Sequence, residues 1–226
     1  MLPSSTVENY LKAIYQWQTR LPAGQRLVQM GQLAAALGVT PGSATAMVKA
    51  LFESGLVEYE AYSGVRLTPA GEKLAGLVLR RHRLVELFLV QVMGMSWTEV
   101  HEEAEQLEHV VSERLIERMD EMLGRPDVDP HGDPIPGPEG IIQQRHLETL
   151  LTCPIGRPLI VKRIINQDPE FLRFIEGHDL KPGQTIRIEA RDPAADSVQI
   201  RGRGDRLVTI GARAAASLLV DVDEVS

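Results

Sequence analysis

Imidazole and carboxylate groups are concentrated in one segment of the 226-residue chain, VHEEAEQLEHVV, between residues 100 and 111. At about 100° per residue, a helix over this segment would bring four of these groups into one band beside an apolar stripe. The four are His101, Glu105, Glu108 and His109. Nitrogen and oxygen ligands set beside a buried edge in this way can hold a divalent metal ion. A solvated acidic helix face would produce the same pattern, and the spacing alone leaves both interpretations open.

A second pair of the same chemical types lies upstream, in RRHRLVELFLV. His82 and Glu86 are four residues apart, so they share one face of another predicted helix. Two helices that each offer an imidazole and a carboxylate could supply two metal sites or one shared site. His82 taken alone would instead be interpreted as an ordinary surface histidine.

The first 70 residues contain the order of elements that would carry DNA binding. Apolar residues at helical spacing cover 7–18 and 29–37, and Gly38 follows the second stretch where a glycine commonly ends a helix. Thr40 and Pro41 are typical of the cap and first turn of a third helix. The alternation in LVEYEAYSGVRLTP then predicts a β-hairpin. This order indicates a winged helix-turn-helix, with a small helical bundle and an incidental hairpin as the alternative.

The predicted third helix places polar groups where DNA would lie. Thr40, Ser43, Thr45 and Lys49 fall on or near its first turns. Hydroxyl groups and the N–H groups of a helix N-terminus suit phosphates and groove edges, and Thr40 is also expected to cap the helix. Lys49 and Arg66, the latter in the wing, are predicted to contact the DNA backbone. Because winged-helix repressors read two-fold symmetric operators as dimers, we expect a homodimer on double-stranded DNA.

The rest of the chain divides into a helical part and a β-rich part. Helices are predicted over 69–92 and from about residue 98 to 124, followed by an irregular segment rich in proline and glycine up to residue 140. A short helix is expected over 141–151. The segments PLIVKRI, TIRIEAR, SVQIRG and RLVTIG then predict the strands of a small barrel, with a helical turn at PEFLRFIEG. The predicted fold class is mainly α with a β wing, plus a small all-β barrel.

Charge and composition narrow the possible functions. Within the net charge of −7, residues 1–83 hold nine Lys or Arg and five Asp or Glu, a net charge of +4. Residues 84–140 hold three Lys or Arg and fourteen Asp or Glu, a net charge of −11. Residues 141–226 hold twelve basic and twelve acidic residues, a net charge of zero. The N-terminal part therefore suits phosphate and the middle part suits cations. A single cysteine excludes an internal disulfide, and no membrane-spanning apolar run or secretory signal is visible, so we expect a cytoplasmic protein without a membrane partner.

Taken together, the stretches TVENYLKAIY, RHRLVELFL, VHEEAEQLEH and HGDPIPG resemble the diphtheria toxin repressor family of metal-dependent transcriptional regulators, which has iron-dependent and manganese-dependent branches. The resemblance covers nearly the whole chain. It implies a repressor of metal-uptake genes whose dimer is ordered for operator binding by Mn²⁺ or Fe²⁺. The implied domains are a winged helix-turn-helix DNA-binding domain over residues 1–70, a helical metal-binding and dimerisation domain over 71–140, a linker over 141–152 and an SH3-like barrel domain over 153–226.

The resemblance also implies two metal sites. The primary site falls on Glu105, Glu108, His109 and Asn9, and the second site falls on His82, Glu86 and His101. Gln167 and Glu170 stand where the SH3-like domain would lend oxygen ligands to the second site, although surface residues before a helical turn would look the same. Glu105 follows the manganese branch, where the iron branch has cysteine. A carboxylate-rich site without a thiolate suits Mn²⁺ or Fe²⁺.

Two residues depart from the manganese-branch pattern. Asn9 offers a neutral amide oxygen in place of a carboxylate. Lys12 stands where that branch has a second carboxylate, and an ammonium group cannot ligate a cation. We therefore expect two separated metal sites rather than a closely spaced two-metal centre.

Two other classes of function compete with the repressor. A His/Glu metal site could activate water in a metal-dependent hydrolase. The chain has no HExxH motif, no nucleophile with a placed base and no glycine-rich phosphate loop, so we predict no catalytic residue and no enzyme. A metal-buffering or metal-delivery protein would not need the helix-turn-helix. DNA binding therefore separates both alternatives from the repressor.

Overall fold

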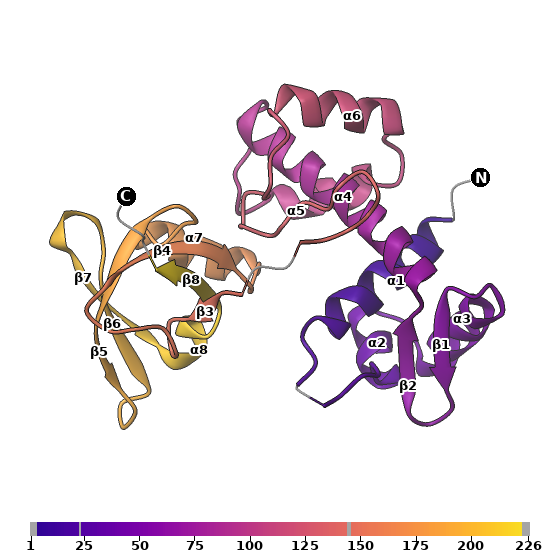
Figure 1. The fold of residues 1–226 in the computed structure, drawn as a ribbon, viewed down its shortest axis with the longest axis horizontal. Coiled ribbons are helices and arrows are strands. Elements are labelled where there is room, and N and C mark those ends of the chain that lie inside the picture. The colour runs from indigo at the N-terminus through magenta and orange to yellow at the C-terminus, as the bar shows by residue number, and fades with distance from the viewer. Residues whose placement is uncertain (1–3, 23, 144–145, 223–226) are drawn as a thin grey trace. The chain divides into compact units, whose positions relative to one another are not determined.

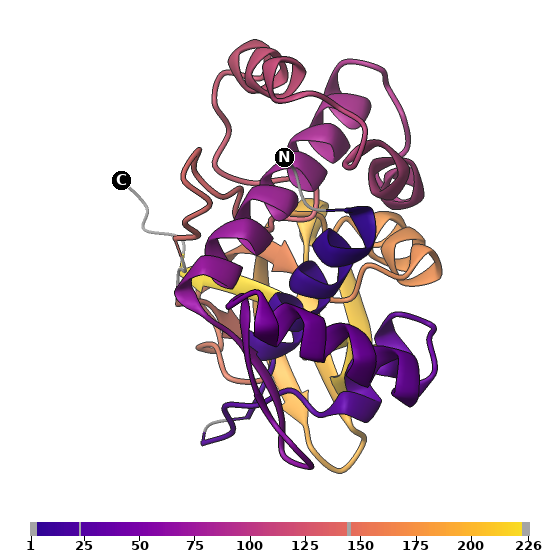
Figure 2. The same ribbon diagram turned by 90° about the vertical axis from the view of Figure 1, so that its right-hand side faces the viewer.

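A computed structural model describes residues 4–22, 24–143 and 146–222, which form two compact units. The first unit comprises Met1–His82, Leu107–Glu113 and Ile135–Ile142, and the second comprises Arg83–Gln106, Arg114–Pro134 and Gln143–Ser226. The boundary falls within the long helix α4, Pro69–Gln91, which Figure 2 shows along its full length. No described helix combines the length and the apolar character that a membrane span requires.

The first unit contains the winged helix-turn-helix that the sequence predicts. Its elements are α1 (Ser5–Gln18), α2 (Met30–Ala36), α3 (Pro41–Glu53) and the antiparallel strands β1 (Val57–Glu60) and β2 (Gly64–Leu67) (Figure 1). Ser4 and Thr40 cap α1 and α3, because the side-chain oxygen of each accepts a hydrogen bond from a main-chain N–H group in the first turn. An apolar core drawn from all three helices and both strands holds the domain together.

The wing is anchored where two main chains approach closely. Val28 and Val65 exchange main-chain hydrogen bonds of 2.8 and 3.0 Å. The neighbouring Gly64 has a φ of +142°, and a Cβ there would overlap the carbonyl of Val28. Glycine is therefore required at the start of β2. The pairing of Val28 with Val65 anchors the hairpin, and Tyr62 in its turn is fully exposed.

The predicted helix that carries the His/Glu band is interrupted. Helix α5 (Val100–Leu107) ends before Glu108, residues 108–112 form a turn, and α6 (Glu113–Met122) follows. The prediction of one continuous helix from about residue 98 to 124 was wrong. A continuous helix would have placed Leu115 on the same apolar stripe as Val111, but Leu115 is 53% exposed. Ser112 directly precedes α6, and serine favours the N-cap of a new helix over the interior of a continuous one.

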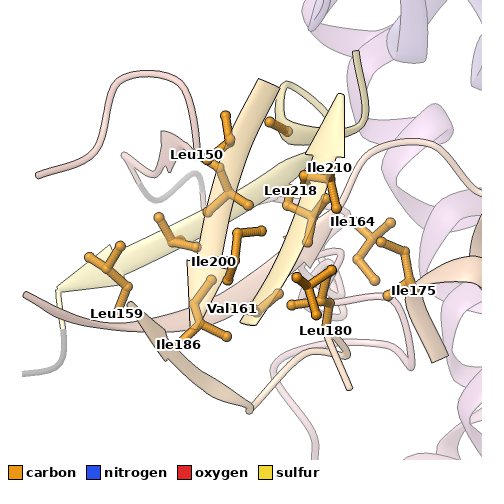
Figure 3. Packing of buried hydrophobic residues seen from close by; sticks show 14 of the residues in the cluster. Leu150, Leu159, Val161, Ile164, Ile175, Leu180, Ile186, Ile200, Ile210 and Leu218 are labelled. Carbon is orange, nitrogen blue, oxygen red and sulfur yellow. The ribbon is translucent and has the colours of Figure 1, made fainter. Parts of the chain in front are cut away.

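The second unit contains the β-rich domain, a six-stranded antiparallel sheet of order β3-β8-β4-β5-β6-β7. The strands are β3 (Glu148–Thr149), β4 (Pro158–Ile164), β5 (Thr185–Asp192), β6 (Ser197–Arg201), β7 (Leu207–Gly211) and β8 (Leu218–Val222). The connections contain α7 (Pro169–Gly177), the 3-10 turn η1 (Arg203–Asp205) and the short α8 (Ala212–Ala215). Alternate side chains of the strands fill an apolar core with residues of α7 (Figure 3).

The beginning of this domain differs from the prediction. The helix expected over 141–151 was wrong, because residues 141–143 and 146–147 have no regular structure, residues 148–149 form β3 and residues 150–151 form a turn. Strand β3 has only two residues, and it pairs with β8 through Glu148↔Val220 and Thr149↔Leu219. Its conformation therefore depends on a partner about 70 residues away, which local periodicity does not indicate.

Candidate metal centres and DNA-binding surface

Glu108 is the centre of a buried polar network in the first unit. The turn after α5 leaves it 0% exposed. Its Oε1 accepts a hydrogen bond from Nζ of Lys12 at 2.7 Å, and its Oε2 accepts one from Nδ1 of His82 at 2.6 Å. Burial alone would raise the pKa of Glu108, but the hydrogen bond from His82 and the charge of Lys12 lower that pKa below the usual glutamate value. Glu108 is therefore a carboxylate anion held between two donors.

Two predicted primary-site ligands of the first unit have unsatisfied atoms. Nδ1 of His109 lies 2.6 Å from Oε2 of Glu8 and donates a hydrogen bond to that carboxylate, which leaves Nε2 as the ring nitrogen that can act as a ligand. This Nε2 is buried 3.3 Å from Oε1 of Glu108. Neither it nor the buried Oδ1 of Asn9 has a hydrogen-bond partner among the described residues. Unsatisfied buried polar atoms are uncommon, and these two are of the types that bind a metal ion.

A second cluster of carboxylates and imidazoles lies in the second unit. Glu86 of α4, Asp129 and His131 are buried, and one ligand atom from each lies within 4.8 Å of the others. His101 of α5 donates from Nδ1 to Oε1 of Glu86 at 3.0 Å, and its Nε2 lies 3.5 Å from Oε1 of Glu105. This set of nitrogen and oxygen ligands, without a thiolate, is of the kind that Mn²⁺ and Fe²⁺ prefer.

The ring of His131 is oriented by a main-chain carbonyl group. Its Nε2 donates to the carbonyl oxygen of Trp97 at 2.9 Å, which leaves Nδ1 as the ring nitrogen that can act as a ligand. Nδ1 is buried without a hydrogen-bond partner among the described residues and lies 3.9 Å from Oε2 of Glu86. Metal-ligating histidines commonly donate their other nitrogen to a carbonyl or carboxylate in this way. The arrangement therefore fits a divalent metal ion.

Asp129 is held in this cluster by its own loop. Its Oδ1 accepts hydrogen bonds from the main-chain N–H groups of His131 at 2.8 Å and Asp133 at 2.9 Å. Burial, followed by the negative charges of Asp133 and Glu86, raises the pKa of Asp129 well above the usual aspartate value. The guanidinium group of Arg83, whose Nε lies 3.8 Å from Oδ2, offsets part of this effect. A cation bound here would relieve the repulsion among the carboxylates.

Asp129 and His131 were not among the predicted ligands. Their segment, DPHGDP, is rich in proline and glycine, which predicts only an irregular connection. The signal that could have identified them is an aspartate and a histidine two residues apart, followed by a glycine. That glycine, Gly132, has a φ of +85°, and a Cβ on it would overlap the carbonyl of Lys162. The glycine therefore allows the ligand loop to pack directly against β4.

Gln167 and Glu170 have other surroundings in the second unit. Gln167 donates from Nε2 to Oδ2 of Asp133 at 2.6 Å, and Arg163 also pairs with Asp133. Glu170 is exposed in the first turn of α7 and belongs to no potential metal-ligand group among the described residues. Their role as second-site ligands stays a prediction.

The predicted ligand sets are divided between the two units. Those of the first unit are Asn9, His82, Glu108 and His109, and those of the second are Glu86, His101, Glu105, Gln167 and Glu170. Within the first unit, the structure brings Glu108 into contact with His82 and His109. Within the second, it brings Glu86 and Glu105 into contact with His101. The complete primary and second sites stay predictions.

The hydroxyl groups predicted to face DNA lie at the N-terminus of α3 and make local hydrogen bonds. Oγ1 of Thr40 accepts from the N–H group of Ser43 at 3.2 Å, which confirms its role as the helix cap. Oγ1 of Thr45 donates to the carbonyl of Pro41 at 2.8 Å. Thr40 and Ser43 are exposed and Thr45 is half-buried. Contacts of these three residues with DNA stay predictions.

The two basic residues predicted to contact DNA differ in their surroundings. Lys49 is exposed on α3. Arg66 donates from Nε to Oε2 of Glu58 at 2.6 Å across the hairpin, so part of its charge is already neutralised. The exposed Arg26, which was not predicted, lines an open pocket of about 480 Å³ together with Arg66. Arg26 is a further candidate for phosphate contact. The sequence feature that could have indicated it is a basic residue two positions before Val28, which pairs with the wing.

Comparison with known proteins identifies each part of this arrangement. Residues 3–65 match the iron dependent repressor N-terminal DNA binding domain, residues 68–137 the iron dependent repressor metal binding and dimerisation domain, and residues 148–222 the FeoA domain. The iron-dependent repressor IdeR of Mycobacterium tuberculosis is 29% identical over 215 residues, which cover 87% of this chain and 89% of IdeR. The regulator MntR of Lysinibacillus sphaericus is 34% identical over 122 residues, which cover 54% of this chain and 84% of MntR. The chain belongs to the family of metal-dependent repressors.

Solved structures of similar repressors share the whole fold. One described as a manganese-dependent transcriptional repressor in complex with manganese is 37% identical, with a TM-score of 0.87 over 96% of this chain and 99% of that chain. The apo form of the manganese-activated repressor ScaR is 30% identical, with a TM-score of 0.79 over 95% of this chain and 99% of that chain. These matches confirm the predicted function, a metal-dependent DNA-binding transcriptional repressor, with operator DNA and a second copy of the chain as partners. Its homologues depend on iron or manganese.

Proposed function

We propose that this repressor binds Mn²⁺ or Fe²⁺ at two separate sites and, with metal bound, represses metal-uptake genes. The second site would use Glu86, Asp129 and His131, with His101 in contact with Glu86. The observation that carries this proposal is the buried Nδ1 of His131, which lacks a hydrogen-bond partner among the described residues and lies beside buried carboxylates. That nitrogen has the orientation of a ligand before any ion is added.

The residues of the second site have separate tasks. His131 offers a nitrogen lone pair whose direction is set by the Trp97 carbonyl. Glu86 and Asp129 offer oxygen ligands and negative charge. A bound cation supplies the positive charge that these carboxylates lack. Because Glu86 belongs to α4 and the other two to the loop before Asp133, binding at this cluster would tie that loop to the helix.

We propose the primary site at Glu105, Glu108, His109 and Asn9, with His82, Gln167 and Glu170 as additional candidates for the second. The support for the primary site is that Nε2 of His109 and Oδ1 of Asn9 both lack hydrogen-bond partners among the described residues. Asn9 belongs to α1, and His109 to the turn after α5. A ligand held by both would stabilise one arrangement of the DNA-binding domain and increase its population.

Operator recognition would use the exposed N-terminus of α3 and the wing. Lys49 and Arg26 are proposed as phosphate contacts, and Thr40, Ser43 and Thr45 as contacts in or near the groove. For the homodimer, we propose that the apolar residues at the end of α4 form part of the contact, since Val92 and Met93, just beyond that helix, are 50% and 63% exposed.

The test uses the full chain, stripped of metal with a chelator. A duplex enriched from a random pool in the presence of Mn²⁺ is labelled, and its binding is followed by fluorescence anisotropy with and without Mn²⁺ or Fe²⁺. We expect metal to tighten DNA binding by about 5- to 150-fold, the usual range of coupling between two sites. Equal affinity of the stripped and metal-loaded chains would overturn the proposal.

Two variants connect the effect to the second site. Glu86→Gln should raise the Mn²⁺ concentration needed for DNA binding, because it removes a charged ligand. Glu103→Gln, on the exposed side of α5, makes the same chemical change away from the cluster and should leave that concentration unchanged. We further infer a cytoplasmic protein, because its partner is genomic DNA, and one without catalytic activity, because its relatives are transcriptional regulators. A hydrolase screen of the Mn²⁺-loaded chain tests the second part.

A further inference from the structure

Lys12 and Glu108 form an ion pair that connects α1 to the turn after α5. Lys12 is 6% exposed and Glu108 is 0% exposed, so both charges have left water. Nζ of Lys12 lies 2.7 Å from Oε1 of Glu108. A buried carboxylate needs a positive partner, because an uncompensated charge in the interior is strongly unfavourable. In this chain an ammonium group supplies that positive charge at a predicted metal ligand.

The ammonium group of Lys12 is hydrogen-bonded to the oxygen of Glu108 that a metal ion would use. Oε1 of Glu108 is also the oxygen that lies 3.3 Å from Nε2 of His109, the nitrogen without a hydrogen-bond partner among the described residues. An ion coordinated by Nε2 of His109 and Oε1 of Glu108 would share that oxygen with Nζ of Lys12. Two positive charges within a few ångströms of each other repel strongly in a buried site.

Charge balance in the surrounding network supports the same interpretation. Glu8 is buried and pairs with Arg81, which is also buried. The two buried carboxylates, Glu8 and Glu108, are therefore matched by the two buried cations, Arg81 and Lys12. In the second unit, by contrast, the carboxylates of Asp129, Asp133 and Glu86 lie close together, and the charge of Arg83 offsets only part of their repulsion. The buried carboxylates and buried cations around Glu108 are thus balanced before any metal ion enters.

We propose that Lys12 is the resident counter-cation of the primary metal site, so that a metal ion binds at Glu108 only when the ammonium group of Lys12 leaves that carboxylate. This inference rests on the proposed function, since it concerns the same primary site. Its consequence is that Lys12 weakens metal binding at Glu108 and thereby raises the metal concentration at which the primary site fills. At the second site Arg83 lies 3.8 Å from Oδ2 of Asp129 and Arg163 pairs with Asp133, but three buried carboxylates, those of Glu86, Asp129 and Asp133, face these two cations. The second site therefore keeps a negative charge and fills first.

The test compares Lys12→Met with the full wild-type chain by calorimetric titration of Mn²⁺ into chelator-stripped protein. We expect the weaker class of sites to bind Mn²⁺ at least about tenfold more tightly in Lys12→Met than in the wild type. The reason is that a charge at short range changes the equilibrium constant for binding another charge, as for a proton, by about one to three log units. Adding His109→Gln to Lys12→Met should abolish this gain. Lys73→Met is the matched control, because Lys73 pairs with Glu139 on the exposed surface of the same unit.

Thermal unfolding gives a second readout that does not involve DNA. Metal-free Lys12→Met should unfold at a lower temperature than metal-free wild type, because Glu108 loses a buried partner. Mn²⁺ should then raise the unfolding temperature of Lys12→Met by more than it raises that of the wild type. If Lys12→Met does not fold, Lys12→Gln keeps a hydrogen-bond donor without the charge and should show the same gain in affinity.

The outcomes separate this inference from the proposed function. If the wild type binds Mn²⁺ and both Lys12 variants give its isotherm unchanged, the role of Lys12 is overturned and the metal-dependent function stands. If Lys12→Met binds Mn²⁺ more tightly than the wild type, but metal does not change DNA binding by the wild type, the role of Lys12 stands and the proposed function is overturned. If none of the proteins binds Mn²⁺, both are overturned.

Discussion

His131 donates a hydrogen bond from Nε2 to the main-chain carbonyl of Trp97 at 2.9 Å. The two rings also lie close together, with centroids 5.5 Å apart. Trp97 is itself fixed, because its Nε1 donates to Glu176 at 3.1 Å and its ring belongs to the apolar core of the second unit. The direction of the His131 lone pair is therefore set by the packed interior rather than by a mobile side chain.

Replacing His131 with phenylalanine should remove the nitrogen ligand while keeping an aromatic ring in the core. We expect Mn²⁺ binding at the second site to weaken by at least about 10- to 100-fold, the usual cost of losing even an outer-shell partner of a metal ligand. Calorimetric titration of the full chain measures this. His178→Phe, which alters a half-buried histidine whose ring packs at an angle against Phe174, is the control and should leave Mn²⁺ affinity unchanged. Wild-type affinity in His131→Phe would rule out His131 as a ligand.

The stability of the metal-free chain should depend on the protonation of Asp129. Burial and the charges of Asp133 and Glu86 raise the pKa of Asp129 above its ordinary value of 3.8. Between that value and the raised one, the folded state holds a proton that the unfolded chain releases, so the free energy of unfolding falls as pH rises. The unfolding temperature of the wild type should therefore fall relative to Asp129→Asn across this range in the presence of chelator.

Saturating Mn²⁺ provides the control for this pH effect. A cation beside Asp129 favours the ionised carboxylate, so the relative loss of stability at higher pH should shrink or disappear in the wild type. Parallel curves for wild type and Asp129→Asn in chelator would contradict the raised pKa.

Lys49→Ala should weaken DNA binding in a way that depends on salt. Loss of one phosphate contact is expected to reduce the slope of log affinity against log salt concentration by about 0.9. Anisotropy titrations at several salt concentrations measure this slope. Lys73→Ala removes another exposed lysine of the first unit and should leave it unchanged. Arg66→Ala should change it less than Lys49→Ala, since Glu58 already pairs with Arg66.

Gly132→Ala should destabilise the loop that carries two ligands of the second site. A Cβ at Gly132 would overlap the carbonyl of Lys162, whereas one at Gly156, with a φ of +77°, would meet nothing within 4 Å. Gly156→Ala is therefore the control for backbone strain alone, with an expected loss of about 1 kcal/mol. Gly132→Ala should lose about 2 kcal/mol more because the main chains must separate. Urea unfolding measures both, and equal losses would contradict the close packing.

The elements that depend on neighbouring residues could be predicted. Thr40 caps α3, and the segment PEFLRFIEG forms α7 with the same bounds, because caps and helical turns are set by groups a few residues apart. The strands β4 to β7 follow from their β-branched segments in the same way. The pairing of His101 with Glu105 was also predictable, since residues four apart meet on one face of a helix.

The sequence by itself determined the local elements, their order and the types of ligand that the chain offers. Tertiary structure alone decided where the helix after Val100 ends and that a proline-rich loop brings Asp129 and His131 close to Glu86. It also decided that Lys12 pairs with Glu108, which lies 96 residues away in the sequence. The physical reason is that helical and strand periods describe one element at a time. Contacts between distant residues depend on how the elements pack and on which buried charges can be compensated there.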